Sequence, residues 1–389
     1  MRLRGYREED GKAVAGLASG SLGGSVERWE EYYTPERNPR LDPGQVYVVE
    51  EDGDIRATAA VLPLEVFVDG RPAAMGGVAA VAAHPAYRRR GYAGRLMRAA
   101  LGGMREQGIH LSMLHPFAHV FYRRFGWELA TEAVSYRLKP TDLPTSPEQE
   151  RLRVYRDEDL PRMMALLEEE ASRHPLCVRR GESCWRRALE REDTEVTVYE
   201  AEGSVEGYVL YGYGEGRNMP RSLNVSEIVA ATPAARGALI SFMVAFDPLM
   251  FEVRYSTPRG EPLHPYLPSS YVEARVSPEF MLRLVDVEGA LKLLRRDTGA
   301  PLVLEVEDDE IPENAGEYTV GHGRVIRGAE AGDRVSLDVR QLAQLYAGYL
   351  PARSLLRHGL VRPGSKRAME LLEAFFPPGD PWIFPPDDF

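Results

Sequence analysis

An internal repeat is the feature that most constrains how this chain can fold. Three pairs of segments match each other: residues 4–10 with 153–159, residues 51–54 with 201–204, and residues 81–86 with 229–234. Their offsets are 149, 150 and 148 residues. Markers that keep one spacing over such distances indicate a duplicated structural unit. We therefore predict two copies of one α/β domain, each beginning with a strand that leads into a helix.

Length and charge narrow the class of protein. The chain has 389 residues, which suits two or three domains. It carries 48 basic and 59 acidic residues, a formal net charge of −11, which argues against a nucleic-acid partner and is compatible with a cationic small substrate. The N-terminus lacks the apolar core of a signal peptide, and no apolar run is long enough to cross a bilayer. We expect a cytoplasmic protein without a membrane partner.

The two cysteines give no sign of a disulfide or metal framework. Cys177 and Cys184 are too few for a network of disulfides. His174 lies close to them in sequence, but the spacing of the three residues fits no common zinc motif. We therefore expect no metal.

The pattern of the sequence changes near Val287. From there on it predicts an α+β module, with strands at 301–306, 318–320 and 324–326 and helices at 338–349 and 365–376. We accordingly divide the chain into domains 1–140, 141–286 and 287–389. The last segment, 376–389, contains five prolines, which make it stiff. It is also too apolar for a typical disordered terminus, so we expect it to dock on the protein.

A basic cluster follows the small-residue run of the first copy. Residues 81–87 predict a strand and a turn, and Gly91 precedes a helix from Tyr92 to about Gly103. A helix N-terminus carries about half a positive charge and suits a phosphate group, to which the arginines before Gly91 add charge. The second copy is two residues shorter there and keeps only Arg236. For the loop of the first copy, the alternative is an ordinary solvated basic turn before a helix. We expect only the first copy to bind such a ligand, the alternative being that both copies are active.

The pattern Arg88-x-x-Gly91-x-Ala93 resembles the pyrophosphate loop of the GNAT acetyltransferases, which bind acetyl-coenzyme A. The resemblance implies that the end of the strand pairs with the pantetheine arm like an added strand, and that the loop holds the pyrophosphate. The implied cofactor-binding residues are Val81, Ala82, Ala83, Arg88, Arg89, Arg90, Gly91, Tyr92, Ala93 and Gly94, with Phe117 and Ala118 lining the cofactor arm.

A tyrosine follows the next predicted strand, 109–114. In the GNAT fold a tyrosine at this place protonates the leaving thiolate. The reference pKa values of a thiol and a phenol are about 8.5 and 10, so the transfer is feasible when the geometry is fixed. Tyr122 stands there, at the start of the segment 122–127. The alternative is that Tyr122 only packs among its aromatic neighbours.

Two GNAT-like copies followed by a smaller module resemble the Eis (enhanced intracellular survival) family of acetyltransferases. The motifs that carry this resemblance are the Tyr-x-Arg-Phe-Gly-aromatic element at 122–127 and the segment 81–91. It implies a fold of α/β and α+β type, with tandem GNAT-like domains, the second degenerate, and then a module like sterol carrier protein. It also implies a hexamer, for which an exposed Trp382 would add support. Finally, it implies a general base on the chain's own terminal carboxylate, at Phe389.

The sequence contains no clear motif for the site that binds the acceptor amine, so its residues are candidates chosen one by one. Trp29, which has three glutamates beside it, is a candidate wall of the acceptor pocket, and an ordinary helix face is the alternative. We expect Asp388 to attract a cationic acceptor. His119 is the competitor of Phe389 as general base.

Together these patterns predict an acetyl-coenzyme A-dependent N-acetyltransferase that acts on an amine of a cationic small molecule, such as an aminoglycoside or a polyamine-like compound. The transfer is expected to be direct, because no cysteine nucleophile stands near the motifs. The alternative is a non-catalytic protein that binds a lipid or another small ligand through its C-terminal module.

Overall fold

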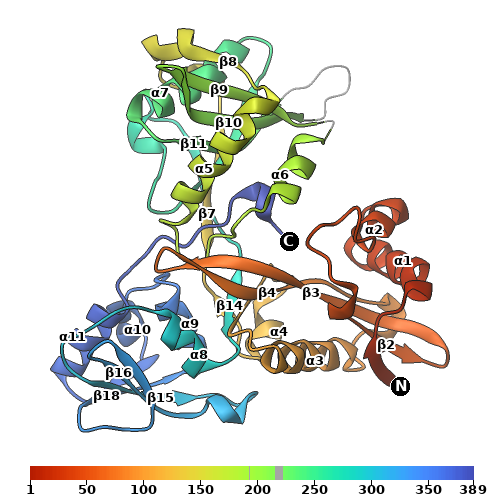
Figure 1. Cartoon of the computed structure of the whole chain (residues 1–389), viewed down its shortest axis with the longest axis vertical. Coiled ribbons are helices and arrows are strands. Elements are labelled where there is room, and N and C mark those ends of the chain that lie inside the picture. Colours follow the sequence, from red (N-terminus) through yellow and green to blue (C-terminus); the bar gives the residue numbers. More distant parts are fainter. Residues whose placement is uncertain (192, 215–221) are drawn as a thin grey trace. The chain divides into compact units, whose positions relative to one another are not determined.

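The computed structural model describes residues 1–191, 193–214 and 222–389 (Figure 1). Its internal contacts divide the chain into two units. The first unit comprises residues 1–130, 279–379 and 389; the second comprises residues 131–278 and 380–388. Each unit is therefore built from segments that are far apart in the sequence.

The first unit contains a seven-stranded sheet that carries the first repeat copy. Its strand order is β1-β2-β3-β4-β5-β14-β6. The strands are β1 (Arg2–Gly5), β2 (Val46–Glu51), β3 (Asp54–Val68), β4 (Arg71–Ala83), β5 (Leu111–Leu114), β6 (Glu128–Leu129) and β14 (Met281–Leu284). β3 and β4 form a long antiparallel hairpin, whereas β4 and β5 run parallel.

Four helices complete this part of the first unit: α1 (Gly11–Leu22), α2 (Val26–Tyr32), α3 (Tyr92–Glu106) and α4 (His119–Arg123). Figure 1 shows α3 running along the sheet. Apolar residues on one face of α3 are buried in a core cluster with β3 and β4, and they include Leu96, Met97, Ala100, Leu101 and Met104. α3 begins at Tyr92 as predicted and ends three residues later than predicted.

The second unit contains another seven-stranded sheet, of order β13-β7-β12-β11-β10-β9-β8. Its strands are β7 (Glu132–Leu138), β8 (Leu152–Val154), β9 (Glu195–Ala201), β10 (Ser204–Gly214), β11 (Ser222–Ala230), β12 (Glu252–Pro258) and β13 (Glu273–Pro278). Its helices include α5 (Leu160–Ala171), α6 (Glu182–Leu189) and α7 (Pro233–Phe242). α7 packs on the sheet through Ala235, Ala238 and Leu239, which are buried in the core of this unit.

The same ion pair opens both repeat copies. Arg4 donates to both carboxylate oxygens of Asp10, at 2.7 and 2.9 Å, before α1 begins. Arg153 makes the same contacts with Asp159, at 2.7 and 2.8 Å, before α5 begins. In each copy the aspartate also accepts the backbone N–H three residues before it. The repeated sequence thus preserves the same hydrogen-bonded 3-10 turn, Glu8–Asp10 or Asp157–Asp159, directly before the first helix of each copy.

Two strands do not lie in the sheet of their neighbours in sequence. β7 directly follows β6 in sequence, yet it lies in the second sheet between β13 and β12. β14 follows β13, yet it lies in the first sheet between β5 and β6. The domain boundaries at residues 140 and 286 stay a prediction.

An α+β domain follows, as the sequence predicts, and it belongs to the first unit. Its five strands, in the order β17-β16-β15-β18-β19, are β15 (Leu302–Glu307), β16 (Gly316–Gly321), β17 (Arg324–Arg327), β18 (Asp333–Asp338) and β19 (Val361–Pro363). Its helices are α8 (Val287–Leu293), α9 (Val339–Tyr346), α10 (Ala352–Arg357) and α11 (Lys366–Phe375). Over the described residues, we find no helix with both the length and the apolar character of a membrane span.

The proline-rich tail docks, as predicted. Residues 380–388 belong to the second unit, where Ile383 and Phe384 are buried. The expectation of an exposed Trp382 is wrong: its side chain is 4% exposed and packs against Phe384. Asp387 is fully buried and accepts from the guanidinium of Arg180 at 2.7 and 3.0 Å. Because Trp382 is buried, it gives no support for assembly into a hexamer.

Candidate active site

The sheet of the first unit opens between β4 and β5. The two strands pair only from Met75–Leu111 to Gly77–Met113. Beyond Gly77, β4 continues to Ala83 and pairs with β3 on its other side. Beyond Gly77 the backbone of β4 therefore has no neighbouring strand on one side, as strand addition by a ligand requires. At the end of the predicted pantetheine segment, the carbonyl of Ala83 accepts the hydroxyl of Ser21 at 3.0 Å.

A β-bulge shapes this open edge. Ala60 pairs with Ala79 and Thr58 pairs with Ala82, so β4 has one more residue than β3 between these pairs. Ala80 has φ of 51°, in the left-handed region that non-glycine residues rarely adopt. Bulges of this kind redirect a strand next to active sites. Sequence reasoning missed this feature, because a run of alanines gives no signal for it.

The predicted pyrophosphate loop lies between β4 and α3. Gly91 caps α3 with φ of 84°, and Arg89 also has a positive φ of 64°. Arg88, Arg89, Arg90 and Gly91 are exposed. The structure thus brings an exposed cationic loop to the N-terminus of a fifteen-residue helix, where backbone N–H groups favour an anion.

The aromatic residues of this loop hold its shape. The ring of Tyr87 lies under two guanidinium groups, those of Arg56 at 4.1 Å and Arg90 at 4.8 Å. The side chain of Tyr92 is buried, and its hydroxyl donates to Glu51 at 2.6 Å. The backbone N–H of Tyr92 can therefore bind a ligand, whereas its side chain packs in the core. Ala93 and Gly94 follow in the same first helical turn.

Tyr122 lies on α4, just after the open end of β5. Its ring packs edge-on against Phe117 at 5.1 Å and Phe121 at 5.0 Å. It shares a core cluster with Val78 and Leu114, which lie on the two separating strands. Burial raises the pKa of Tyr122 above its usual value, so the phenol stays protonated at neutral pH. Packing and proton donation are thus compatible roles for this side chain.

Exposed apolar side chains lie beside Tyr122, in the segment from Phe117 to Val120. Phe117 is 64% exposed and Val120 is 74% exposed. Ala118 is exposed between them. These side chains are in the same unit as the loop and Tyr122. An exposed apolar patch of this kind suits the largely apolar arm of a ligand.

The chain's last residue lies against the first unit. The ring of Phe389 packs at 4.9 Å from that of Phe280, which also meets His115 edge-on at 5.4 Å. The ring also lies over Gly77: a Cβ atom added there would come within 2.8 Å of Cε2 of Phe389. Gly77 is the last β4 residue that pairs with β5. Phe389 is therefore seated where the two strands separate.

The remaining acceptor-side candidates differ in their surroundings. Trp29 lies on α2, where its indole N–H donates to the carbonyl of Gly23 at 2.7 Å and its ring packs against Tyr32 at 5.2 Å. Asp388 is exposed and belongs to the second unit. His119 is the first residue of α4, three residues before Tyr122.

The second repeat copy lacks a cofactor loop of this form. Thr232 caps α7 directly, and Pro233 is the first residue of the helix. Arg236 lies inside α7 and pairs with Glu261 at 3.1 Å. The segment therefore offers no arginine-rich turn ahead of a helix, as predicted from its sequence.

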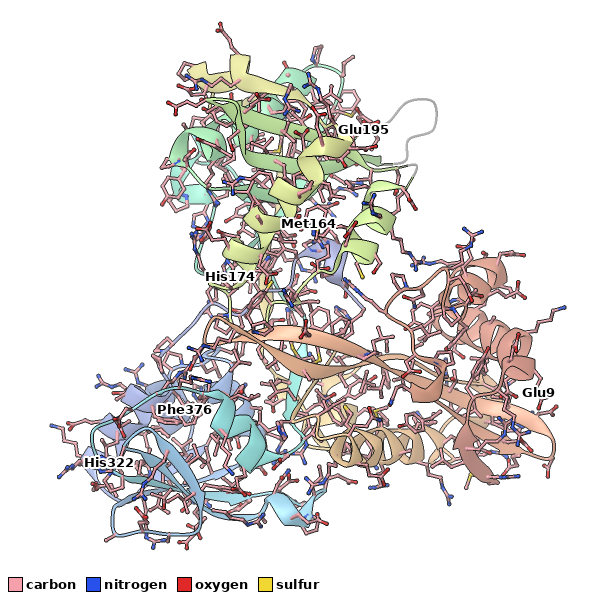
Figure 2. All side chains as sticks on the ribbon, viewed as in Figure 1. Glu9, Met164, His174, Glu195, His322 and Phe376 are labelled. Carbon is pink, nitrogen blue, oxygen red and sulfur yellow. The ribbon has the colours of Figure 1, made fainter. Side chains whose placement is uncertain are left out.

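One cluster of possible metal ligands occurs among the described residues, in the second unit. Ligand atoms of Glu170, His174 and Glu261 all lie within 4.8 Å of one another; His174 is labelled in Figure 2 just after α5. Burial lowers the pKa of His174, but its bonds to Glu170 and to the carbonyl of Asp380 raise it overall. Arg236 pairs with Glu261 at 3.1 Å and His174 lies 3.5 Å from Glu170, so each carboxylate of the cluster already has a partner. The absence of a metal stays a prediction.

Comparisons with known proteins match all three parts of the chain. Residues 2–130 and residues 176–284 each match an acetyltransferase (GNAT) domain, and residues 287–384 match a sterol carrier protein domain. An uncharacterized N-acetyltransferase of Streptomyces griseus is 27% identical over 356 residues, which cover 83% of each chain.

Solved structures share the fold over the whole chain. A GCN5-related N-acetyltransferase from Anabaena variabilis superimposes with a TM-score of 0.88 at 22% identity, covering 100% of both chains. Eis1 from Mycobacterium abscessus superimposes with a TM-score of 0.80 at 23% identity, again covering 100% of both chains. The present chain thus consists of two acetyltransferase (GNAT) domains followed by a sterol carrier protein domain, and it is an acyltransferase.

Proposed function

We propose that this enzyme transfers the acetyl group of acetyl-coenzyme A directly to an amine, with Tyr122 as general acid and the terminal carboxylate of Phe389 as general base. One observation carries the proposal: Phe389 is seated on Gly77, where β4 and β5 separate. That place is in the same unit as Tyr122 and the basic loop.

The cofactor would use the open edge of β4 and the loop before α3. Backbone groups of Val81, Ala82 and Ala83 would pair with the amides of the pantetheine arm. The arginines at 88–90 and the N–H groups of Gly91 to Gly94 would hold the pyrophosphate. The exposed side chains of Phe117 and Ala118 would line the arm.

Each proton has a place in this scheme. An amine acceptor with a lysine-like pKa near 10.4 arrives as an ammonium ion and must lose a proton before it attacks. The carboxylate of Phe389 takes that proton, directly or through a water. The neutral amine then forms a bond to the thioester carbon, the C–S bond breaks, and the leaving thiolate takes the phenolic proton of Tyr122. The new amide nitrogen loses its remaining extra proton to solvent, and the Tyr122 phenolate regains a proton from solvent before the next turnover. Burial raises the pKa of Tyr122, so the phenol is protonated at neutral pH and has a proton to give when the thiolate forms.

An acyl-enzyme is not part of the scheme. Both cysteines, Cys177 and Cys184, belong to the second unit. Burial raises the pKa of the Cys177 thiol well above its usual value, so this group is a poor nucleophile.

The acceptor we propose is a cationic small molecule such as an aminoglycoside or a polyamine-like compound. The net charge of −11 supports a cationic partner. Asp388, as a residue that attracts the cation, and Trp29, as a pocket wall, stay separate candidates from the sequence. We also propose a hexamer, as the resemblance to the Eis family implies, and a cytoplasmic enzyme. The full-length likeness of fold to Eis1 is compatible with that family.

The test is an assay of thiol release from acetyl-coenzyme A with a panel of amines. Turnover with at least one cationic amine is expected, and Tyr122→Phe should lower kcat by about 10²–10⁴-fold while acetyl-coenzyme A binds as before. An enzyme that binds the cofactor but acetylates no amine would favour the alternative, a protein that binds a lipid or other small ligand through its C-terminal domain.

A further inference from the structure

Arg283 is a buried arginine that the proposed mechanism leaves unexplained. It lies on β14, paired with Ser112 of β5, and its side chain is fully buried. β14 also pairs with β6, so Arg283 lies within the sheet that carries the site. Charged side chains are almost never fully buried unless they are paired or have a specific task.

One side of the guanidinium is held by Asp308. Nη2 of Arg283 donates to Oδ2 of Asp308 at 2.6 Å, and both side chains are buried. Asp308 follows β15, in the sterol carrier protein domain. It also accepts the backbone N–H groups of Glu310 and Ile311, at 3.2 and 3.1 Å, and the side-chain amide of Asn314 at 3.0 Å. Asp308 is therefore a rigid anchor.

The other side of the guanidinium faces the segment that follows Tyr122. Among the described residues, Nε and Nη1 of Arg283 have no hydrogen-bond partner. A Cβ atom added to Gly126 would lie 2.6 Å from Cζ of Arg283, so only glycine fits against the planar group. Gly126 also has φ of 85°, which glycine adopts without strain.

Gly126 belongs to a tight turn that fixes the backbone of Tyr122. The carbonyl of Tyr122 accepts the N–H groups of Phe125 at 2.9 Å and Trp127 at 3.3 Å. The N–H of Gly126 donates to the carbonyl of Arg123 at 3.1 Å. A group packed against Gly126 therefore limits how far the whole turn, and Tyr122 with it, can move.

Stability alone is a weak explanation for this arrangement. A buried ion pair is often no more stabilising than well-packed apolar side chains of the same volume. Two unpaired buried donors add a further desolvation cost. Buried polar atoms without a hydrogen-bond partner are rare in native proteins, and a catalytic role is one explanation for them.

We propose that Arg283 is a positioning residue for Tyr122: anchored by Asp308 of the C-terminal domain, its guanidinium braces the turn 122–127 and fixes the direction of the phenol. This inference rests on the proposed function, in which Tyr122 protonates the thiolate. It assigns the C-terminal domain a part in catalysis besides supplying the chain's end.

The test is a double-mutant cycle between Arg283 and Tyr122. Arg283→Lys keeps a cation for Asp308 but removes the planar group from Gly126. We expect kcat to fall on the order of tenfold to a hundredfold, as for a small misplacement of a catalytic group, while the Kd of acetyl-coenzyme A and the KM of the amine stay the same. In the Tyr122→Phe background, Arg283→Lys should have no further effect. Arg4→Lys is the matched control: Arg4 also pairs with an aspartate, Asp10, both side chains are largely buried, and the pair lies outside the proposed site. This variant should leave kcat unchanged.

Each outcome decides the matter. If the loss caused by Arg283→Lys multiplies that of Tyr122→Phe, or if kcat does not change, Arg283 does not act through Tyr122. Unchanged turnover in Tyr122→Phe alone would refute the general acid, and the role of Arg283 with it. If Arg283→Lys does not fold, the double variant Arg283→Met/Asp308→Asn removes both buried charges and enters the same cycle, with the same two results expected.

Discussion

Replacing Gly77 by alanine should displace the C-terminal Phe389 and so remove the proposed base. The added methyl carbon would lie 2.8 Å from Cε2 of Phe389 and 2.8 Å from Cδ1 of Leu64. Carbon atoms are in favourable contact at about 3.5–4.0 Å, so neither neighbour can keep its position. Gly77 is paired on both sides, with Leu62 of β3 and Met113 of β5, so the backbone cannot retreat. Phe389 lies outside every helix and strand, so we expect its ring to move rather than the β4 backbone.

The expected size of the effect separates activity from stability. Overpacking of this kind costs about 1–3 kcal/mol of folding free energy, whereas loss of a general base lowers kcat by about 10²–10⁴-fold. Steady-state kinetics with an amine, a cofactor Kd by calorimetry and a thermal melt measure the three quantities. Gly102→Ala is the matched control, because a Cβ atom at Gly102 of α3 meets nothing within 4 Å.

A second substitution makes the test specific for the terminus. Phe389→Leu keeps the carboxylate and shortens the side chain, so in the Gly77→Ala background it should restore part of the lost turnover. The clash with Leu64 is the same in both variants and cannot account for such a rescue. A Gly77→Ala enzyme with a wild-type kcat would refute the argument that the seat of Phe389 matters for catalysis.

Three further outcomes are expected. Arg89→Ala should weaken acetyl-coenzyme A binding by about 1.5–3 kcal/mol, the value of a hydrogen bond to a charged group, and Arg236→Ala should not; equal Kd values in calorimetry would contradict the site. A few residues added after Phe389 should abolish transfer while cofactor binding survives, whereas an N-terminal tag should leave both transfer and cofactor binding intact. Full activity of the protein extended at its C-terminus would make His119→Ala the next variant to test. The hydrogen bond from Arg4 lowers the pKa of Asp10, so this carboxylate stabilises the fold above its unfolded pKa of about 3.9 and that stability is lost as the pH falls through the lower folded value. Asp10→Asn should therefore be less stable than the wild type at pH 7, with the gap closing towards pH 3 in denaturant titrations; a gap that does not depend on pH would argue against the pair.

The repeat could be predicted because its markers are local. The Arg4–Asp10 and Arg153–Asp159 pairs join residues six positions apart, so both partners of each pair lie within one repeated segment. The loop at 88–94 was likewise visible, since arginines, a glycine and a helix start are contiguous in sequence. Features of this kind depend on nearest neighbours along the chain, and periodicity reports them well.

The parts that were missed depend on contacts between distant segments. β14 has four residues, and nothing in Met281–Leu284 indicates that it pairs with β5 rather than with its neighbour in sequence. Arginine is mostly an exposed residue, and nothing in the local sequence indicates that Arg283 is fully buried. Gly77 carried a usable signal: an isolated glycine pair inside a strand suggests the close approach of another group, and here that group is the ring of Phe389.

The exchange of β7 and β14 bears on how the protein is made. β5 and β6 pair with β14 on either side, and β14 is synthesised only after the whole of the second sheet. During translation both strands therefore keep an open edge while more than a hundred further residues are added, and open edges invite pairing with other chains. The first acetyltransferase domain cannot be closed by its own residues. A gene fragment that ends after β6 would encode a sheet without β14, so the first copy cannot be produced alone with its complete sheet.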